Sequence, residues 1–253
     1  MTDTALAAPS FAEPEFRIGS VMSKTLIVLS RNLLTFCIVT AIANLPHVLL
    51  INRENYGIKM MVGALLSALS WAILIYVAFE DMRGRPVELM TSFGHVRRRF
   101  LPVIGTFLLG WFAVFLLWFS SVGAVWLTSL LLVVPVLMFL PVLMLTMWFV
   151  AIPACVVEQL GPLGSLRRSA ALTKGHRWKV FGMLAVLGIA SVISGVGLDA
   201  LDAAVGTTIG RLANLIWNAG FEVFCVILIV VTYYDLRVAK EGFDTDRTAA
   251  VFE

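Results

Sequence analysis

Long apolar blocks separated by short polar segments dominate the chain. The longest runs from Phe100 to Val157, fifty-eight residues without one charged side chain. That length is enough for two membrane-spanning helices of ~20 residues each, joined by a tight turn. Backbone N–H and C=O groups in lipid must be hydrogen-bonded within the segment, so the block is predicted to be mostly helical. The pattern therefore predicts an integral membrane protein.

Six spans are predicted, which makes the fold class an all-α polytopic membrane helical bundle. The uncharged block supplies the third and fourth spans, with a turn at residues 120–129, where Ser, Gly and Thr collect. The remaining spans are predicted at residues 32–50, 60–79, 180–198 and 212–234. The prolines of the fourth span are Pro135, Pro141 and Pro153. A proline removes a backbone donor and clashes with the preceding turn, so this helix should be kinked or broken.

Basic residues are distributed unequally between the segments that join the spans. Sixteen of the nineteen Lys and Arg residues fall in alternate segments that include both termini, and only Arg53, Lys59 and Arg211 fall in the others. Cytoplasmic loops of membrane proteins carry an excess of Lys and Arg. Both termini are therefore predicted to be cytoplasmic.

Three amphipathic stretches, near residues 18–30, 86–98 and 163–173, each precede an odd-numbered span. Such helices lie flat at the headgroup level, with basic residues toward anionic lipid. In the first stretch, Lys24 falls opposite the apolar face. The arginines predicted to bind lipid headgroups are Arg97, Arg98, Arg99, Arg167 and Arg168. The unit of interfacial helix, span and return span occurs three times, which predicts a threefold internal repeat.

Composition assigns most of the chain to the membrane. Hydrophobic residues make up 60% of the chain and charged residues 14%, against ~25% charged in an average soluble domain. We expect a disordered tail at residues 1–15, a membrane domain at 16–240 and a cytoplasmic tail at 241–253. The three cysteines lie in apolar stretches, as packing residues rather than a disulfide framework.

Candidate catalytic chemistry is sparse. The three histidines have no metal-ligand spacing, and the chain has no nucleophile-elbow, phosphate-loop or paired-carboxylate motif. The sequence therefore predicts a protein that is not an enzyme and needs no cofactor. Spans begin directly beside the arginine run at residues 97–99, so this run indicates phospholipid contact rather than nucleic-acid binding.

Glu222 is the exception within the spans. It lies in the predicted sixth span, which contains no basic residue. An acid there is costly and usually faces the bundle interior, and Asn218, one turn earlier, is its nearest candidate partner. Two interpretations stay open. Glu222 is either a proton or substrate site, or a structural carboxylate that is hydrogen-bonded between helices or wetted near the outer surface.

Two segments near the ends of the fourth and sixth spans carry a resemblance. The first contains Glu158, Gly161, Ser169, Leu172, Thr173 and Gly175, and the second Tyr233, Tyr234, Asp235, Leu236, Arg237, Glu241, Gly242 and Asp244. They resemble the E-x-x-G…S-x-x-L-T-x-G and Y-Y-D-L-R…E-G-x-D segments of bacterial six-span proteins grouped with the membrane domain of glycerophosphoryl diester phosphodiesterase. The resemblance covers about residues 16–246. It implies a multi-pass protein of the bacterial inner membrane without the catalytic barrel, and it implies no catalytic residue.

The same segments predict a cytoplasmic seam that holds the bundle together. Glu158 is placed to pair with Arg167 or Arg168 across a short turn. Asp235 and Arg237 are placed to fix the end of the sixth span to a neighbouring cytoplasmic element, such as the loop with Arg167.

Taken together, these patterns favour a non-enzymatic membrane protein that organises or handles lipid, or that serves as a membrane scaffold or subunit. Its expected partners are membrane phospholipids and a protein partner or second copy, and no nucleic acid. The alternative is a transporter or channel component, favoured by Glu222 and the proline-rich fourth span.

Overall fold

The computed structural model describes residues 16–49, 56–84, 101–110, 112, 113, 115, 116, 119 and 133–241. Within this part the protein is helical and contains no strand, which confirms the predicted all-α class. The helices are α1 (Ile18–Arg31), α2 (Leu33–Leu49), α3 (Tyr56–Met82), α5 (Val133–Trp148), α6 (Ala151–Val157), α7 (Pro162–Thr173), α8 (Arg177–Val205) and α9 (Thr207–Glu241), with a further apolar helix over Leu101–Gly110.

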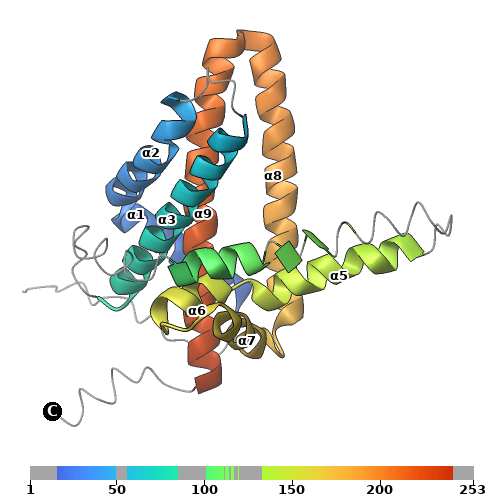
Figure 1. The fold of residues 1–253 in the computed structure, drawn as a ribbon. Helices are drawn as coiled ribbons and strands as arrows, with labels where there is room; N and C mark the ends of the chain where they lie inside the picture. Colours follow the sequence, from blue (N-terminus) through green and yellow to red (C-terminus); the bar gives the residue numbers. More distant parts are fainter. Residues whose placement is uncertain are drawn as a thin grey trace, which may run out of the picture.

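Helix α9 is the centre of the arrangement. It contacts α1, α2, α3, α6, α7 and α8, and Figure 1 shows it running the length of the molecule beside α8. The core gathers around its second half, where Val226, Ile227, Val230 and Tyr233 are fully buried. Apolar side chains of α3, α6 and α1 complete this core.

Helices α8 and α9 form an antiparallel hairpin. Helix α8 ends at Val205 and is followed by Gly206, whose φ of 94° lies in the left-handed region that glycine adopts without strain. The two helices then approach closely, because a Cβ added at Gly210 would lie 2.6 Å from the Cα of Asp202. Glycine is therefore required on α9 at this crossing.

Helices α1 and α2 meet at a bend of 79° centred on Asn32. In α1 the buried side chains are Val21, Lys24, Thr25 and Val28, a spacing that places them on one helical face. An amphipathic helix followed by a first apolar helix was predicted here, and the junction lies where the sequence placed it.

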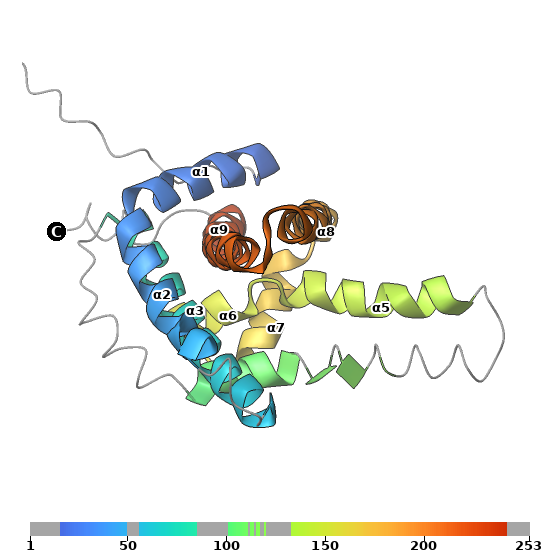
Figure 2. The same cartoon turned by 90° about the horizontal axis from the view of Figure 1, so that it is seen from above.

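The predicted break in the fourth span is also present. Helix α5 ends at Trp148 and α6 begins at Ala151, two residues before Pro153. Figures 1 and 2 show α5 and the helix Leu101–Gly110 extending crosswise to α8 and α9. The latter helix packs tightly on α7, since a Cβ at Gly105 would lie 2.8 Å from Cγ of Pro162.

Within the described residues, three segments are long and apolar enough to cross a membrane: Phe139–Val157, Arg177–Val205 and Leu212–Glu241. The bent pair α1 and α2 gives a fourth if it counts as one span. Six spans and a threefold repeat are not confirmed by these helices. The predicted turn at 120–129, the stretch 86–98 and the tail at 1–15 lie outside the described residues, as do Arg97, Arg98 and Arg99. Of the predicted tail at 241–253, only residue 241 is described.

Candidate functional site

The first strong polar contact joins the two ends of the described chain. Lys24 on α1 donates to both carboxylate oxygens of Asp235 on α9, at 2.9 and 3.1 Å. The side chains are 7% and 4% exposed. A buried charge needs a close partner of opposite sign, so this pair fixes α1 across the last turns of α9.

This contact corrects the predicted placement of Lys24. The helical pattern assigned it to a polar face directed at lipid headgroups, but it lies on the buried face of α1. Asp235 was predicted to bind a neighbouring element such as the loop with Arg167, and the ion pair instead reaches α1. Helix α1 packs directly against α9, which gives the lysine a carboxylate that local sequence does not reveal.

The second group of contacts is centred on Glu158, just after α6. Arg168 on α7 donates through Nε to both oxygens of Glu158, at 2.8 and 2.9 Å. The hydroxyl of Tyr233 on α9 donates to Oε1 of the same carboxylate at 2.8 Å. One carboxylate thus joins α6, α7 and α9.

The contacts continue to the end of α9. The guanidinium of Arg168 also pairs with Glu241, and Glu241 accepts from Arg237 one turn earlier at 2.9 Å. We name these five residues, Glu158, Arg168, Tyr233, Arg237 and Glu241, together with Lys24 and Asp235, the charged seam. Arg168 is occupied by two carboxylates, whereas Arg167 is exposed on the same helix.

Helix α7 has a further role at the break between α5 and α6. The backbone N–H of Val150 donates to Oγ of Ser169 at 3.2 Å, and the Ser169 hydroxyl donates to the carbonyl of Met147 at 2.8 Å. Thr173 lies 3.4 Å from the same carbonyl. Buried backbone groups must be paired, so the hydroxyls of α7 replace bonds that the broken helix lacks.

Glu222 contacts a different helix from the one predicted. The indole Nε1 of Trp71 on α3 donates to Oε1 of Glu222 at 2.6 Å. Asn218 is exposed and donates to the backbone and side chain of Asn214, so the predicted Asn218–Glu222 bond is not formed. The Trp71 ring also packs edge-on against Phe107. This geometry is that of a carboxylate hydrogen-bonded between helices.

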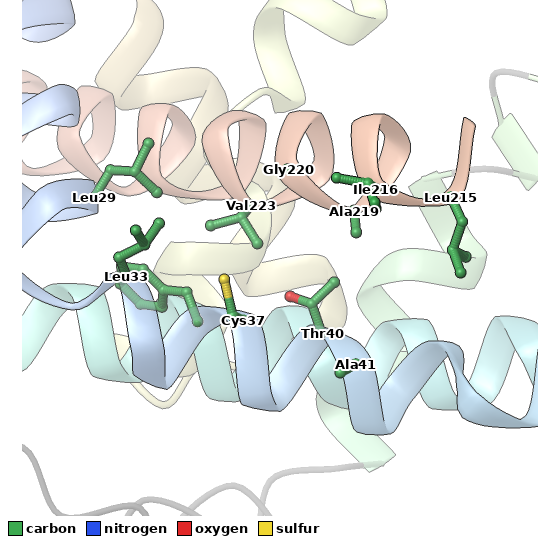
Figure 3. Close-up of a pocket in the computed structure, with 11 residues that line it drawn as sticks. Leu29, Leu33, Cys37, Thr40, Ala41, Leu215, Ile216, Ala219, Gly220 and Val223 are labelled. Carbon is green, nitrogen blue, oxygen red and sulfur yellow. The ribbon is translucent and has the colours of Figure 1, made fainter. Parts of the chain in front are cut away.

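An apolar groove of about 500 Å³ lies between α2 and the first half of α9. Its lining residues are Leu29, Leu33, Phe36, Cys37, Thr40, Ala41, Leu215, Ile216, Ala219, Gly220 and Val223. Figure 3 shows side chains of both helices directed into this space. Among the lining residues Phe36 is fully buried, whereas Leu33 and Ile216 are exposed. We name it the α2–α9 groove.

Among the described residues no group of three or more His, Cys, Asp or Glu side chains is placed to hold a metal ion. The three cysteines are free. Comparisons with protein-family models, curated proteins and solved structures gave no match.

Sequence reasoning missed the groove and both long-range partners. Trp71 and Lys24 are separated from their carboxylates by 151 and 211 residues. The sequence does hold one signal for the groove, since small residues at Ala219 and Gly220 interrupt the large apolar side chains of α9.

Proposed function

We propose that the protein is a non-enzymatic integral membrane protein that organises lipid by holding an acyl chain in the α2–α9 groove. The observation that carries the proposal is the groove itself. It is lined almost entirely by carbon, it opens at the surface of an apolar helical bundle, and its volume falls in the range of ligand pockets.

The lining selects the class of occupant. A polar solute would give up hydrogen bonds to water and find only the Thr40 hydroxyl and the Cys37 thiol in return. An acyl chain makes no hydrogen bonds to water and so loses none on entering the groove. Lipid tails are as apolar as leucine, so a chain that enters from the bilayer gains van der Waals contact rather than hydrophobic free energy. The fit between the chain and the groove therefore decides occupancy.

The finer topology belongs to the same proposal. Six spans in the bacterial inner membrane, with both termini cytoplasmic, would place the charged seam at the cytoplasmic surface. The described chain supports this arrangement, because its first helix and the end of its last helix are joined by the Lys24–Asp235 pair. Arg97, Arg98, Arg99 and Arg167 remain proposed headgroup contacts, the first three on sequence alone.

Filling the groove tests the proposal. A Cβ at Gly220 meets nothing within 4 Å, so Gly220→Leu should project into the groove without a clash. The matched control is Gly188→Leu, because Gly188 is exposed on α8 and also has open space around it. We expect native mass spectra of protein extracted from lipid bilayers to show fewer retained phospholipids for Gly220→Leu than for Gly188→Leu. Equal retention by both variants would contradict the proposal.

A further inference from the structure

Three cations near the start of α8 have no carboxylate partner among the residues that the structure describes. Lys174 follows α7, Arg177 opens α8, and Lys240 is next to the last residue of α9. Within the described part of the chain no carboxylate lies within ion-pairing distance of any of the three, in contrast to Lys24 and Arg168. The described part of the chain therefore brings together positive charge that its own carboxylates do not pair with.

The backbone holds these cations close to one another. Gly175, with φ of 91°, turns the chain sharply between α7 and α8 and keeps Lys174 and Arg177 three residues apart around that turn. The ammonium of Lys240 donates to the carbonyl of Ala171 in the last turn of α7. Lys174, Arg168 and Arg177 are neighbouring positive charges that act on Lys240.

The environment of His176 shows that this region disfavours further positive charge. Burial lowers the pKa of His176, and the charges of Lys179 and Lys240 lower it further. The Nε of Arg177 is buried and has no hydrogen-bond partner. That nitrogen lies out of reach of an external anion, whereas the exposed side chains of Lys174 and Lys240 are accessible to one.

An exposed tryptophan marks the depth of the site in the bilayer. Trp178 directly follows Arg177 and is 76% exposed. Tryptophan concentrates at membrane–water interfaces, where its ring meets the headgroups. Apolar residues of α8 such as Val192 and Val196 lie exposed farther along the same helix. The three cations thus lie at the polar end of the apolar helix α8, at the depth where headgroup phosphates are found in a bilayer.

We propose that Lys174, Arg177 and Lys240 form a binding site for the phosphate of an anionic phospholipid headgroup. Basic pockets between helices at a membrane surface are recognition sites for such headgroups. Ammonium and guanidinium groups both form charge-assisted hydrogen bonds to phosphate oxygens. The site shares no residue with the α2–α9 groove, and it rests on the proposed function only in requiring that the protein lie in a membrane.

The test uses the full chain in bilayers of equal phosphatidylglycerol and phosphatidylcholine, followed by native mass spectrometry of the lipids retained. The variant is the triple substitution Lys174→Gln, Arg177→Gln and Lys240→Gln. Glutamine keeps an N–H that can donate to the Ala171 carbonyl, and circular dichroism checks the fold. The control is Arg53→Gln, Lys59→Gln and Arg211→Gln, which removes the same charge from segments predicted to face the opposite side.

We expect the wild type and the control to enrich phosphatidylglycerol, and the triple variant to retain the two lipids in the ratio supplied. Each single substitution should reduce the enrichment roughly fivefold, the factor that corresponds to ~1 kcal/mol per basic residue. Equal enrichment by the triple variant and the wild type would overturn the proposal. So would saturable binding of inorganic phosphate to lipid-free protein that the triple variant abolishes, if phosphatidylglycerol is not enriched.

The same spectra separate this proposal from the previous one. The groove determines how many phospholipids are retained, whereas the basic site determines which headgroup they carry. If the wild type retains the expected number of phospholipids but shows no headgroup preference, the basic site is contradicted and the groove is not. A headgroup preference that persists in Gly220→Leu, with no difference in count from Gly188→Leu, contradicts the groove alone.

Discussion

Removing one member of the Lys24–Asp235 pair should destabilise the protein far more than removing both charges. Lys24→Met keeps much of the side-chain volume and apolar stem but leaves the carboxylate of Asp235, 4% exposed, without the ammonium 2.9 Å away. The adjoining turns of α1 and α9 are also buried, with Val21, Val28 and Leu236 fully covered. Water therefore has little access to solvate the remaining charge.

The size of the effect follows from the geometry. Two unit charges 2.9 Å apart attract by ~6 kcal/mol at an effective dielectric constant of 20. Desolvation offsets part of this attraction, and the measured cost of breaking a buried pair from one side is about 3–5 kcal/mol. Lys24→Met combined with Asp235→Asn removes both charges. Because replacing a buried pair by neutral groups is often close to neutral in stability, the double variant should recover most of the loss.

The assay is equilibrium unfolding in mixed micelles of mild detergent and dodecyl sulfate, followed by circular dichroism. We expect Lys24→Met to lower the free energy of unfolding by about 3–5 kcal/mol. The free energy of unfolding of the double variant should be well above that of Lys24→Met. Arg167→Met serves as the control, because Arg167 is exposed on α7, and substitutions at such surface positions usually change the free energy of unfolding by no more than ~0.5 kcal/mol. A loss for Lys24→Met no larger than for Arg167→Met would refute the reasoning, as would a double variant less stable than the single one.

Three further outcomes are expected. Ser169→Ala should lower the free energy of unfolding by ~1–3 kcal/mol, because it unpairs buried backbone groups at the α5–α6 break. The control is Ser194→Ala, because the exposed Ser194 hydroxyl bonds within its own helix. This control should stay within ~0.5 kcal/mol of wild type. Trp71→Phe should lower the free energy of unfolding by ~1.5–3 kcal/mol, because it removes a donor to the carboxylate of Glu222. Glu222→Gln keeps an acceptor and should fold and function as wild type. A folded Glu222→Gln protein that fails in a growth or flux assay would show a proton or substrate role instead. His176 has a folded-state pKa below its ordinary value of 6.5, owing to burial and nearby lysines, so its neutral form is favoured on folding. The contribution of neutral His176 to the free energy of unfolding should be complete above pH ~6.5 and be lost as the pH falls through the lower folded-state pKa. Unfolding curves of His176→Gln should lack this loss of stability in acid, and an unchanged pH profile would contradict the prediction.

Local pattern was sufficient for the all-helical class and for two interruptions between the described helices. Polar Asn32 follows an amphipathic stretch and precedes an apolar one, and the bend lies there. Pro153 removes a backbone donor, and the helix breaks just before it. Glu158 and Arg168 are ten residues apart across a turn, so their contact was within the range of local reasoning.

Contacts between distant helices could not be obtained in the same way. Lys24 was assigned to a polar face because the apolar residues of its stretch lie near the opposite face of the helix. Its burial depends on α1 packing over the end of α9, where Asp235 supplies the compensating charge. Glu222 likewise bonds to Trp71 because α3 lies beside α9. A single sequence gives the faces of each helix but not which helices become neighbours.

The groove escaped prediction for a related reason. Its two walls come from α2 and α9, each unremarkable alone, and a cavity exists only where small residues of one helix face larger residues of the other. The apolar pattern of α2 and α9 is equally consistent with burial in the protein and with contact to lipid. Only the relative placement of the helices distinguishes a packed seam from an open groove.

Mapping a photoactivated lipid onto the protein tests lipid binding in the groove most directly. The full chain is placed in bilayers that contain a phospholipid with a diazirine in its acyl chain, irradiated, digested and analysed by mass spectrometry. We predict that cross-links concentrate on the groove-lining segments of α2 and α9, around Cys37 and Ala219, and that Gly220→Leu removes them while Gly188→Leu does not. Cross-links spread evenly along the exposed apolar faces, including α8, and unaffected by Gly220→Leu would contradict the account.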